Sequence, residues 1–191
     1  KNKGIKIVEP VPSLFTFNIE NEKLTAMQGV SFEHVEVKLL NADFENQGAF
    51  MITHWGVSGP AILKLSAWAA RKLKELDYKF KIEINWLPKV SEKDILKNII
   101  DNQQNQPKKI VSANPMFGFN SRFWKFLCDN SNINANQKWA ETGKKHFGLL
   151  VNNILKSQFM VNGKSTFKEE FVAAGGVALD EIDFETFSLK S

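Results

Sequence analysis

The hydrophobic periodicity of this 191-residue chain changes twice, and this limits the folds it can adopt. Apolar and polar residues alternate over 34–40 and 80–86, which predicts strands, and shorter strand candidates lie at 5–8, 14–19 and 49–53. From Pro88 to about Leu155 the apolar residues recur at helical spacing, and short strand patterns return from Ser157. We therefore expect an α+β fold in which a β-rich subdomain (1–87 plus 157–191) carries an inserted small helical subdomain (88–156).

Polar residues mark the expected ends of the helices. Ser91 and Asn120 are suited to cap two helices, and Thr142 precedes a third. The Asn/Gln-rich segments 102–106 and 130–137 are typical of exposed turns. Near the C-terminus, Thr166 and Glu169 predict a capping box, and the run from Ala173 to Val177 allows a tight turn or a close approach of two backbones.

The segment Thr53–Ser66 combines a glycine-containing loop with the start of an amphipathic helix that we expect to reach Leu76. Pro60 fits the first helical position, so Gly59 or Ser58 would be the N-cap. Free N–H groups at such a helix start can bind an anion, and Gly56 and Gly59 would let a ligand approach the backbone. This segment is therefore the first candidate for a binding site.

Composition and charge exclude several classes of protein. The net charge of +4 comes with scattered lysines and no block of like charge, which favours a solvated surface over a nucleic-acid footprint. Cys128 is the single cysteine, so no intramolecular disulfide can form, and a reducing, cytoplasmic location is expected. Apolar runs are too short to span a bilayer. Because the chain begins at Lys1, either processing removed a segment or the chain is part of a longer protein.

Few residues are suited to catalysis or metal binding. The histidines at 34, 54 and 146 lack metal-ligand spacing, so we expect no metal site. We interpret His34 as exposed, and a structural role is favoured for His146 and also for His54, which shares its loop with Ser58. Cys128 is expected to be a small core residue. The chain lacks both Gly-x-Gly-x-x-Gly and a Gly-Lys-Ser/Thr phosphate loop, which argues against independent nucleotide binding.

Aromatic residues are abundant, with five tryptophans and sixteen phenylalanines. They could form stacking platforms for single-stranded nucleic acid. Most of them fall on faces expected to be buried, so core packing is the favoured interpretation. Trp55 is the exception because it lies in a loop.

The stretch Phe50–Leu63 (FMITHWGVSGPAIL) resembles the Thr-His-x-Gly-x-Ser-Gly-Pro-Ala segment of the BaiN-like flavoproteins, bacterial FAD-dependent oxidoreductases also called the aminoacetone oxidase family. Pro12–Leu14 resembles the segment before the first strands of the insert in that family. Phe167–Val177 resembles the return into its FAD-binding domain. Ala173 stands where the family usually has threonine, which places a hydroxyl contact there in doubt.

The resemblance implies that this chain is the inserted middle region of such a protein, with a β-rich subdomain that is barrel-like and a helical subdomain, and without the Rossmann-like segments that hold FAD. The region would cover the flavin and line the cleft for a small-molecule substrate in an oxidoreductase that is expected to be NAD(P)-linked. Its partner would be the FAD-binding domain of the same polypeptide. The isolated chain would then bind no FAD and be inactive. Residues implied to face cofactor or substrate are Thr53, His54, Gly56, Ser58, Gly59, Gly175 and Gly176.

A second hypothesis assigns the chain to another class. In it, the basic helical subdomain, from Ser91 to Leu155, contacts RNA or a protein partner. A nucleic-acid partner is disfavoured by the scattered charge, and salt-dependent RNA binding would favour this alternative.

Overall fold

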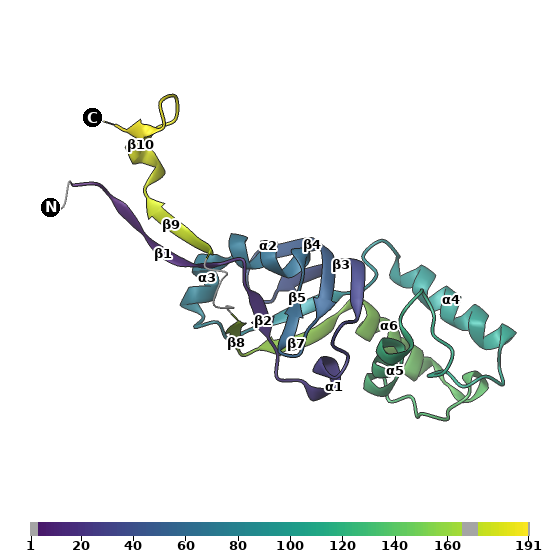
Figure 1. The fold of residues 1–191 in the computed structure, drawn as a ribbon. Helices are drawn as coiled ribbons and strands as arrows, with labels where there is room; N and C mark the ends of the chain where they lie inside the picture. Colours follow the sequence, from purple (N-terminus) through teal and green to yellow (C-terminus); the bar gives the residue numbers. More distant parts are fainter. Residues whose placement is uncertain (1–3, 166–171, 191) are drawn as a thin grey trace.

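The computed structural model describes residues 4–165 and 172–190, and its largest element is a seven-stranded antiparallel sheet (Figure 1). The strand order is β7-β6-β3-β4-β5-β2-β8. The strands are β2 (Thr16–Asn18), β3 (Ser31–Leu39), β4 (Phe44–Ile52), β5 (Gly56–Ser58), β6 (Phe80–Asn85), β7 (Ser157–Val161) and β8 (Gly163–Ser165). The predicted α+β class is confirmed.

The two end strands of this sheet are consecutive in the chain, because only Asn162 separates β7 from β8. β7 pairs with β6, while β8 pairs with β2 at the opposite end of the order. The Asn162 N–H donates to the Asn18 carbonyl between the two ladders, at 3.0 Å. One continuous segment thus joins both ends of the sheet and closes it into a barrel.

Two helices follow β5, and the first of them packs against the inner face of this curled sheet, mainly against β4. They are α2 (Pro60–Trp68) and α3 (Ala70–Glu75), where the sequence predicted one helix. The break lies at Ala69. Upstream, the Ser66 hydroxyl donates to the Leu63 carbonyl and accepts the Phe15 N–H. Back-bonding of a serine to its own helix bends the helix, which accounts for the interruption.

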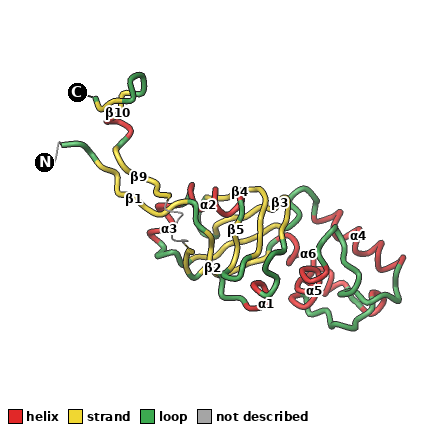
Figure 2. Tube along the Cα trace, viewed as in Figure 1, coloured by secondary structure: helices red, strands yellow, loops and turns green. Residues whose placement is uncertain are grey.

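The helical segment lies between β6 and β7 and occupies one end of the molecule (Figure 2). It contains α4 (Glu92–Asn105), α5 (Ser121–Asn130), the short 3₁₀ helix η1 (Trp139–Glu141) and α6 (Lys144–Leu155). The predicted caps are confirmed, since the Ser91 and Asn120 side chains accept N–H groups of the first turns. The turn predicted at 102–106 is wrong, because α4 continues to Asn105 and buries Ile99. The boundaries of the two subdomains stay a prediction.

An aromatic cluster joins the barrel to the helices. Trp86 follows β6, and its ring centroid lies 4.8 Å from Phe32, 5.3 Å from Phe50 and 4.6 Å from Phe123 of α5. Phe119 extends the cluster on the helical side. The buried residues of barrel and helices belong to one hydrophobic core, so the favoured interpretation of the aromatic residues as core is confirmed for these positions.

A two-stranded arm extends from the other end of the barrel (Figure 1). β1 (Ile7–Ser13) pairs with β9 (Val172–Val177), and the 3₁₀ helix η2 (Leu179–Glu181), β10 (Ile182–Asp183) and β11 (Ser188–Leu189) follow. The sequence predicted a strand that ends before Pro10, but β1 continues through Pro10 to Ser13. A strand at the edge of a two-stranded ribbon tolerates proline because it has no partner on its other side. The capping box predicted at Thr166 and Glu169 lies outside the described residues.

Candidate functional site

The turn between β4 and β5, residues 53–55, follows the end of β4 that pairs with the start of β3, where Phe32 contacts Phe123 of the helical segment. Its backbone is fixed on two sides, because the Trp55 carbonyl accepts the Ile19 N–H at 2.8 Å and the Ile52 carbonyl accepts the Gly29 N–H at 2.9 Å. The Thr53 N–H donates to the Gly56 carbonyl and closes the turn. His54 and Trp55 project into solvent, and 57% of Trp55 is exposed. The turn is a rigid support for two exposed aromatic side chains.

Gly56 and Gly59 allow a close approach, but the approaching backbone belongs to the barrel itself. A Cβ on Gly56 would lie 2.2 Å from the Phe17 carbonyl oxygen of β2. A Cβ on Gly59 would lie 2.9 Å from the Ala49 carbonyl oxygen of β4. The fold alone therefore accounts for both glycines, without a ligand.

The start of α2 matches the predicted chemistry only in part. Gly59 is the N-cap and Pro60 the first helical residue, as expected. The N–H groups of Ile62 and Leu63 both donate to the Gly59 carbonyl, and Ala61 is fully buried. This helix start consequently offers no open row of N–H groups to an anion.

The predicted site residues are not brought together. The Ser58 hydroxyl accepts a hydrogen bond from Thr16 at 3.0 Å and so links β5 to β2. Gly175 lies in the arm at a bulge, where a Cβ would lie 2.7 Å from the Glu9 carbonyl oxygen, and Gly176 follows it in β9. This confirms the close backbone approach predicted for the run from Ala173 to Val177. Gly175 and Gly176 thus lie in the arm, whereas the turn at 53–55 belongs to the barrel.

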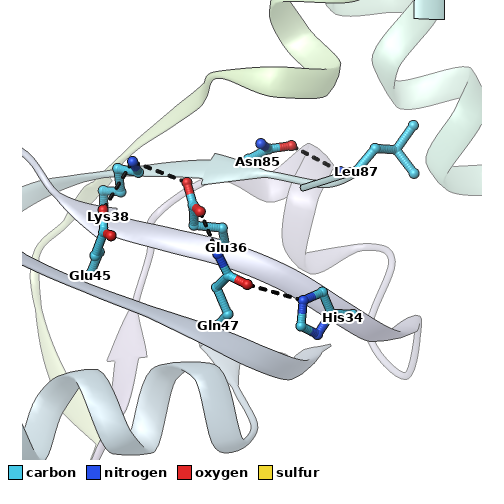
Figure 3. A network of polar contacts seen from close by, with 7 residues as sticks. All are labelled: His34, Glu36, Lys38, Glu45, Gln47, Asn85 and Leu87. Atoms are coloured by element: carbon cyan, nitrogen blue, oxygen red, sulfur yellow. Dashed lines mark hydrogen bonds and ion pairs between the residues drawn. The ribbon is translucent and has the colours of Figure 1, made fainter. Parts of the chain in front are cut away.

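His34 belongs to a polar network on the outer face of β3 and β4 (Figure 3). Its Nε2 lies 3.1 Å from Gln47 Oε1, and the Gln47 amide donates to Glu36 at 2.6 Å. Lys38 forms ion pairs with Glu36 and Glu45, which raise the pKa of Lys38 above its ordinary value. Such cross-strand pairs stabilise a solvent-facing sheet surface, so we assign this network a structural role.

Cys128 is fully buried in α5, and burial raises the pKa of its thiol from 9.0 to about 12. A nucleophilic cysteine needs a lowered thiol pKa, so the raised pKa of Cys128 agrees with its interpretation as a core residue.

The folded state keeps the Cys128 thiol proton while the unfolded chain loses it above pH 9.0, so the free energy of unfolding should fall as pH rises from about 9 to 12. Denaturant titrations of wild type and Cys128→Ala across this range check it; the same slope in both proteins would contradict it.

A groove between α1 (Glu22–Thr25) and α5 was not singled out from the sequence. It is lined by Lys23, Met27, Arg122, Lys125, Phe126 and Asp129, with a volume of about 220 Å³. A shallow, mainly apolar hollow of about 340 Å³ is lined by Gln28 and Gly29, which follow α1, and by Met51, Ile52, Thr53 and His54. A charge count restricted to the helical segment could have drawn attention to this region. Residues 88–156 hold eleven lysines and arginines against five acidic residues, whereas the rest of the chain is net acidic.

Within residues 4–165 and 172–190, no cluster of three His, Cys, Asp or Glu side chains is arranged to hold a metal ion. Over the same residues no helix has the length and apolarity needed to cross a membrane.

Comparison with known proteins places this fold in a family. Residues 11–172 match the family described as the HI0933-like protein barrel and H2TH domain, so the chain belongs to the HI0933-like family. It is also 30% identical over 190 residues to a protein of Haemophilus influenzae named ribosomal RNA dihydrouridine synthase, covering 96% of this chain and 43% of that protein. The chain thus spans less than half the length of this relative. The family fits the flavoprotein context implied by the sequence resemblance; FAD, NAD(P), and a bacterial, cytoplasmic setting stay predictions.

Proposed function

We propose that this chain is the substrate-binding insert of a flavoprotein that reduces uridine to dihydrouridine in RNA. The observation that carries the proposal is the similarity to the ribosomal RNA dihydrouridine synthase, which extends over 96% of the chain. A similarity of this extent covers the barrel, the helical segment and the arm together. RNA then takes the place of the small-molecule substrate, although the charge of the whole chain disfavoured it.

The uneven distribution of charge supports RNA as the substrate. The helical segment is strongly basic although the net charge of the whole chain is only +4. A phosphate backbone is attracted to such a local excess of lysine and arginine, irrespective of the total charge. This combines the two hypotheses from the sequence, because the insert of an oxidoreductase would itself be the RNA-binding module.

The arm suits a connection to an FAD-binding domain of the same polypeptide. Several of its large apolar side chains are exposed to solvent, among them Ile7, Leu179, Phe184 and Phe187. A neighbouring domain would remove this surface from water. Gly175 and Gly176 of β9 would lie next to that domain, while Thr53, His54, Ser58 and Gly59 would belong to the RNA-facing barrel.

FAD itself would be held outside this chain, where it would supply the hydride for reduction of the base. The chain has no glycine-rich phosphate loop, and the N–H groups at the start of α2 are already engaged. The residues present therefore do not fit a complete FAD site, and their role would be to bind RNA and to shield the reacting base from water.

The proposal is tested with the full-length parent protein. We expect it to be yellow and, with NADH or NADPH, to convert uridine to dihydrouridine in ribosomal RNA, measured by mass spectrometry of the digested nucleosides. The isolated 191-residue chain should be colourless and form no dihydrouridine. Full-length flavoprotein that oxidises the nicotinamide but leaves RNA unmodified would overturn the RNA assignment, and tight FAD binding by the isolated chain would overturn its assignment as the insert.

A further inference from the structure

We propose that single-stranded RNA crosses this chain along one continuous surface, from the basic groove between α1 and α5, over α1, to the turn carrying His54 and Trp55. This inference rests on the proposed function and names the site that would hold the RNA. We call this surface the α1 surface, defined by Lys23, Arg122, Lys125, Met51, His54 and Trp55.

The basic part of the α1 surface is open to phosphate groups. Lys23 of α1 and Arg122 and Lys125 of α5 are exposed and line the same groove. Within the described residues none of the three forms an ion pair. Asp129 also lines the groove, so the lining carries three positive charges against one negative charge. Groups of this kind contact the nucleic-acid backbone whatever the sequence.

The part of the α1 surface that carries His54 and Trp55 offers aromatic rings on which an RNA base can stack. Trp55 is 57% exposed and its ring centroid lies 6.0 Å from that of His54, so two flat side chains stand next to each other on the fixed turn. Met51, 42% exposed, lines the apolar hollow beside them. Exposed aromatic side chains on a rigid backbone are stacking platforms for unpaired bases. A purely electrostatic partner, such as an acidic peptide, would not need this part of the surface.

The two parts are contiguous because the segment that directly follows α1 borders both. Met27 lines the basic groove, and the next residue, Gln28, lines the apolar hollow. On its inner side α1 is fixed by Leu24, which is fully buried in the common core. Figure 1 shows α1 beside α5 at the barrel end that is remote from the arm. A strand of RNA can therefore reach cations and aromatic rings without crossing the arm.

The charge contribution is tested by fluorescence anisotropy of the full chain with labelled oligouridine RNA of about 12 nucleotides. The triple variant Lys23→Ala/Arg122→Ala/Lys125→Ala should bind at least about tenfold more weakly, with a slope of log affinity against log salt smaller by about two. The matched control, Lys93→Ala/Lys97→Ala/Lys108→Ala, removes three exposed lysines from α4 and the following turn. It also lowers the basic excess of the helical segment, but it leaves the groove intact and should therefore retain most of the affinity. Equal losses in both variants would overturn the proposal. Asp129→Asn should bind more tightly.

The stacking contribution has its own matched pair of tryptophans. Trp55→Ala should weaken oligouridine binding about tenfold, and Trp55→Phe should restore most of the affinity because stacking is kept. Trp68 is 77% exposed but lies at the end of α2, so Trp68→Ala should bind like wild type. Competition by polyglutamate that equals competition by oligouridine would show that charge alone is recognised, which would overturn the proposal.

The outcomes distinguish this inference from the proposed function. If the full-length protein makes dihydrouridine but the α1-surface variants bind RNA like wild type, the inferred surface is wrong and the proposed function stands. If the α1 surface binds RNA but the full-length protein leaves uridine unchanged, the proposed reaction is wrong and the RNA site stands. Thermal unfolding of each variant, followed by circular dichroism, shows that all are folded at the temperature of the assay.

Discussion

Replacing Gly56 by alanine should destabilise the chain by at least about 3 kcal/mol, because the added methyl group has no space. Its carbon would lie 2.2 Å from the Phe17 carbonyl oxygen and 2.7 Å from the Ile19 nitrogen, both backbone atoms of the barrel. Gly56 also has a φ of 150°, which side chains rarely adopt. Relief of the contact would require β2 and β5 to separate at their only two paired positions, Phe17↔Val57 and Asn18↔Gly56.

The matched control is the same substitution at Gly148. This glycine lies exposed within α6, and a Cβ there would meet no atom within 4 Å. Gly148→Ala should therefore raise the free energy of unfolding by about 0.5–1 kcal/mol, the usual gain at a helix interior. Urea titrations of the three proteins test the pair. A Gly56→Ala protein as stable as wild type would show that β2 and β5 are not packed as described.

Local signals in the sequence predicted many elements of the fold. The alternation around Phe80 and Trp86, the caps Ser91 and Asn120, and the Gly59–Pro60 helix start all reappear at their predicted positions. These features depend on side chains within a few residues of each other, which is why single-sequence patterns detect them.

The features that remained undetected depend on contacts between distant residues. Barrel closure requires Asn162 to meet Asn18, and the arm requires Glu9 to meet Gly175. No local pattern encodes either pairing. The candidate site shows the same limit. The glycines around Thr53 indicated a ligand, but their neighbours are strands of the same barrel. The α1–α5 groove joins Lys23 to Arg122 across 99 positions of the sequence.

Replacement of Trp86 by alanine should have the other large effect, because it should lower the free energy of unfolding by about 3–5 kcal/mol. Trp86 is 1% exposed at the point where the chain leaves β6 for the helices. Its indole N–H donates to the Ser157 hydroxyl at 2.8 Å, and its backbone N–H donates to the Ile154 carbonyl at 2.9 Å. The substitution would leave a cavity among Phe32, Phe50 and Phe123, where the barrel contacts the helices. Because most domains are stable by only about 5–15 kcal/mol, little of the native stability would remain.

Two variants serve as controls for Trp86→Ala, and hydrogen exchange shows which elements lose stability. Trp86→Phe retains an aromatic ring but loses the hydrogen bond to Ser157, so the free energy of unfolding should fall by only about 1–2 kcal/mol. Trp68→Ala, at a side chain that is 77% exposed, should change stability by no more than about 0.5 kcal/mol. Amide hydrogen exchange then separates two possibilities for Trp86→Ala. If barrel and helices share one core, protection should fall in α5, α6 and β6 together. Full protection of α5 and α6 beside an unprotected β6 would instead show that the helical segment folds on its own, with the aromatic cluster only as its attachment to the barrel.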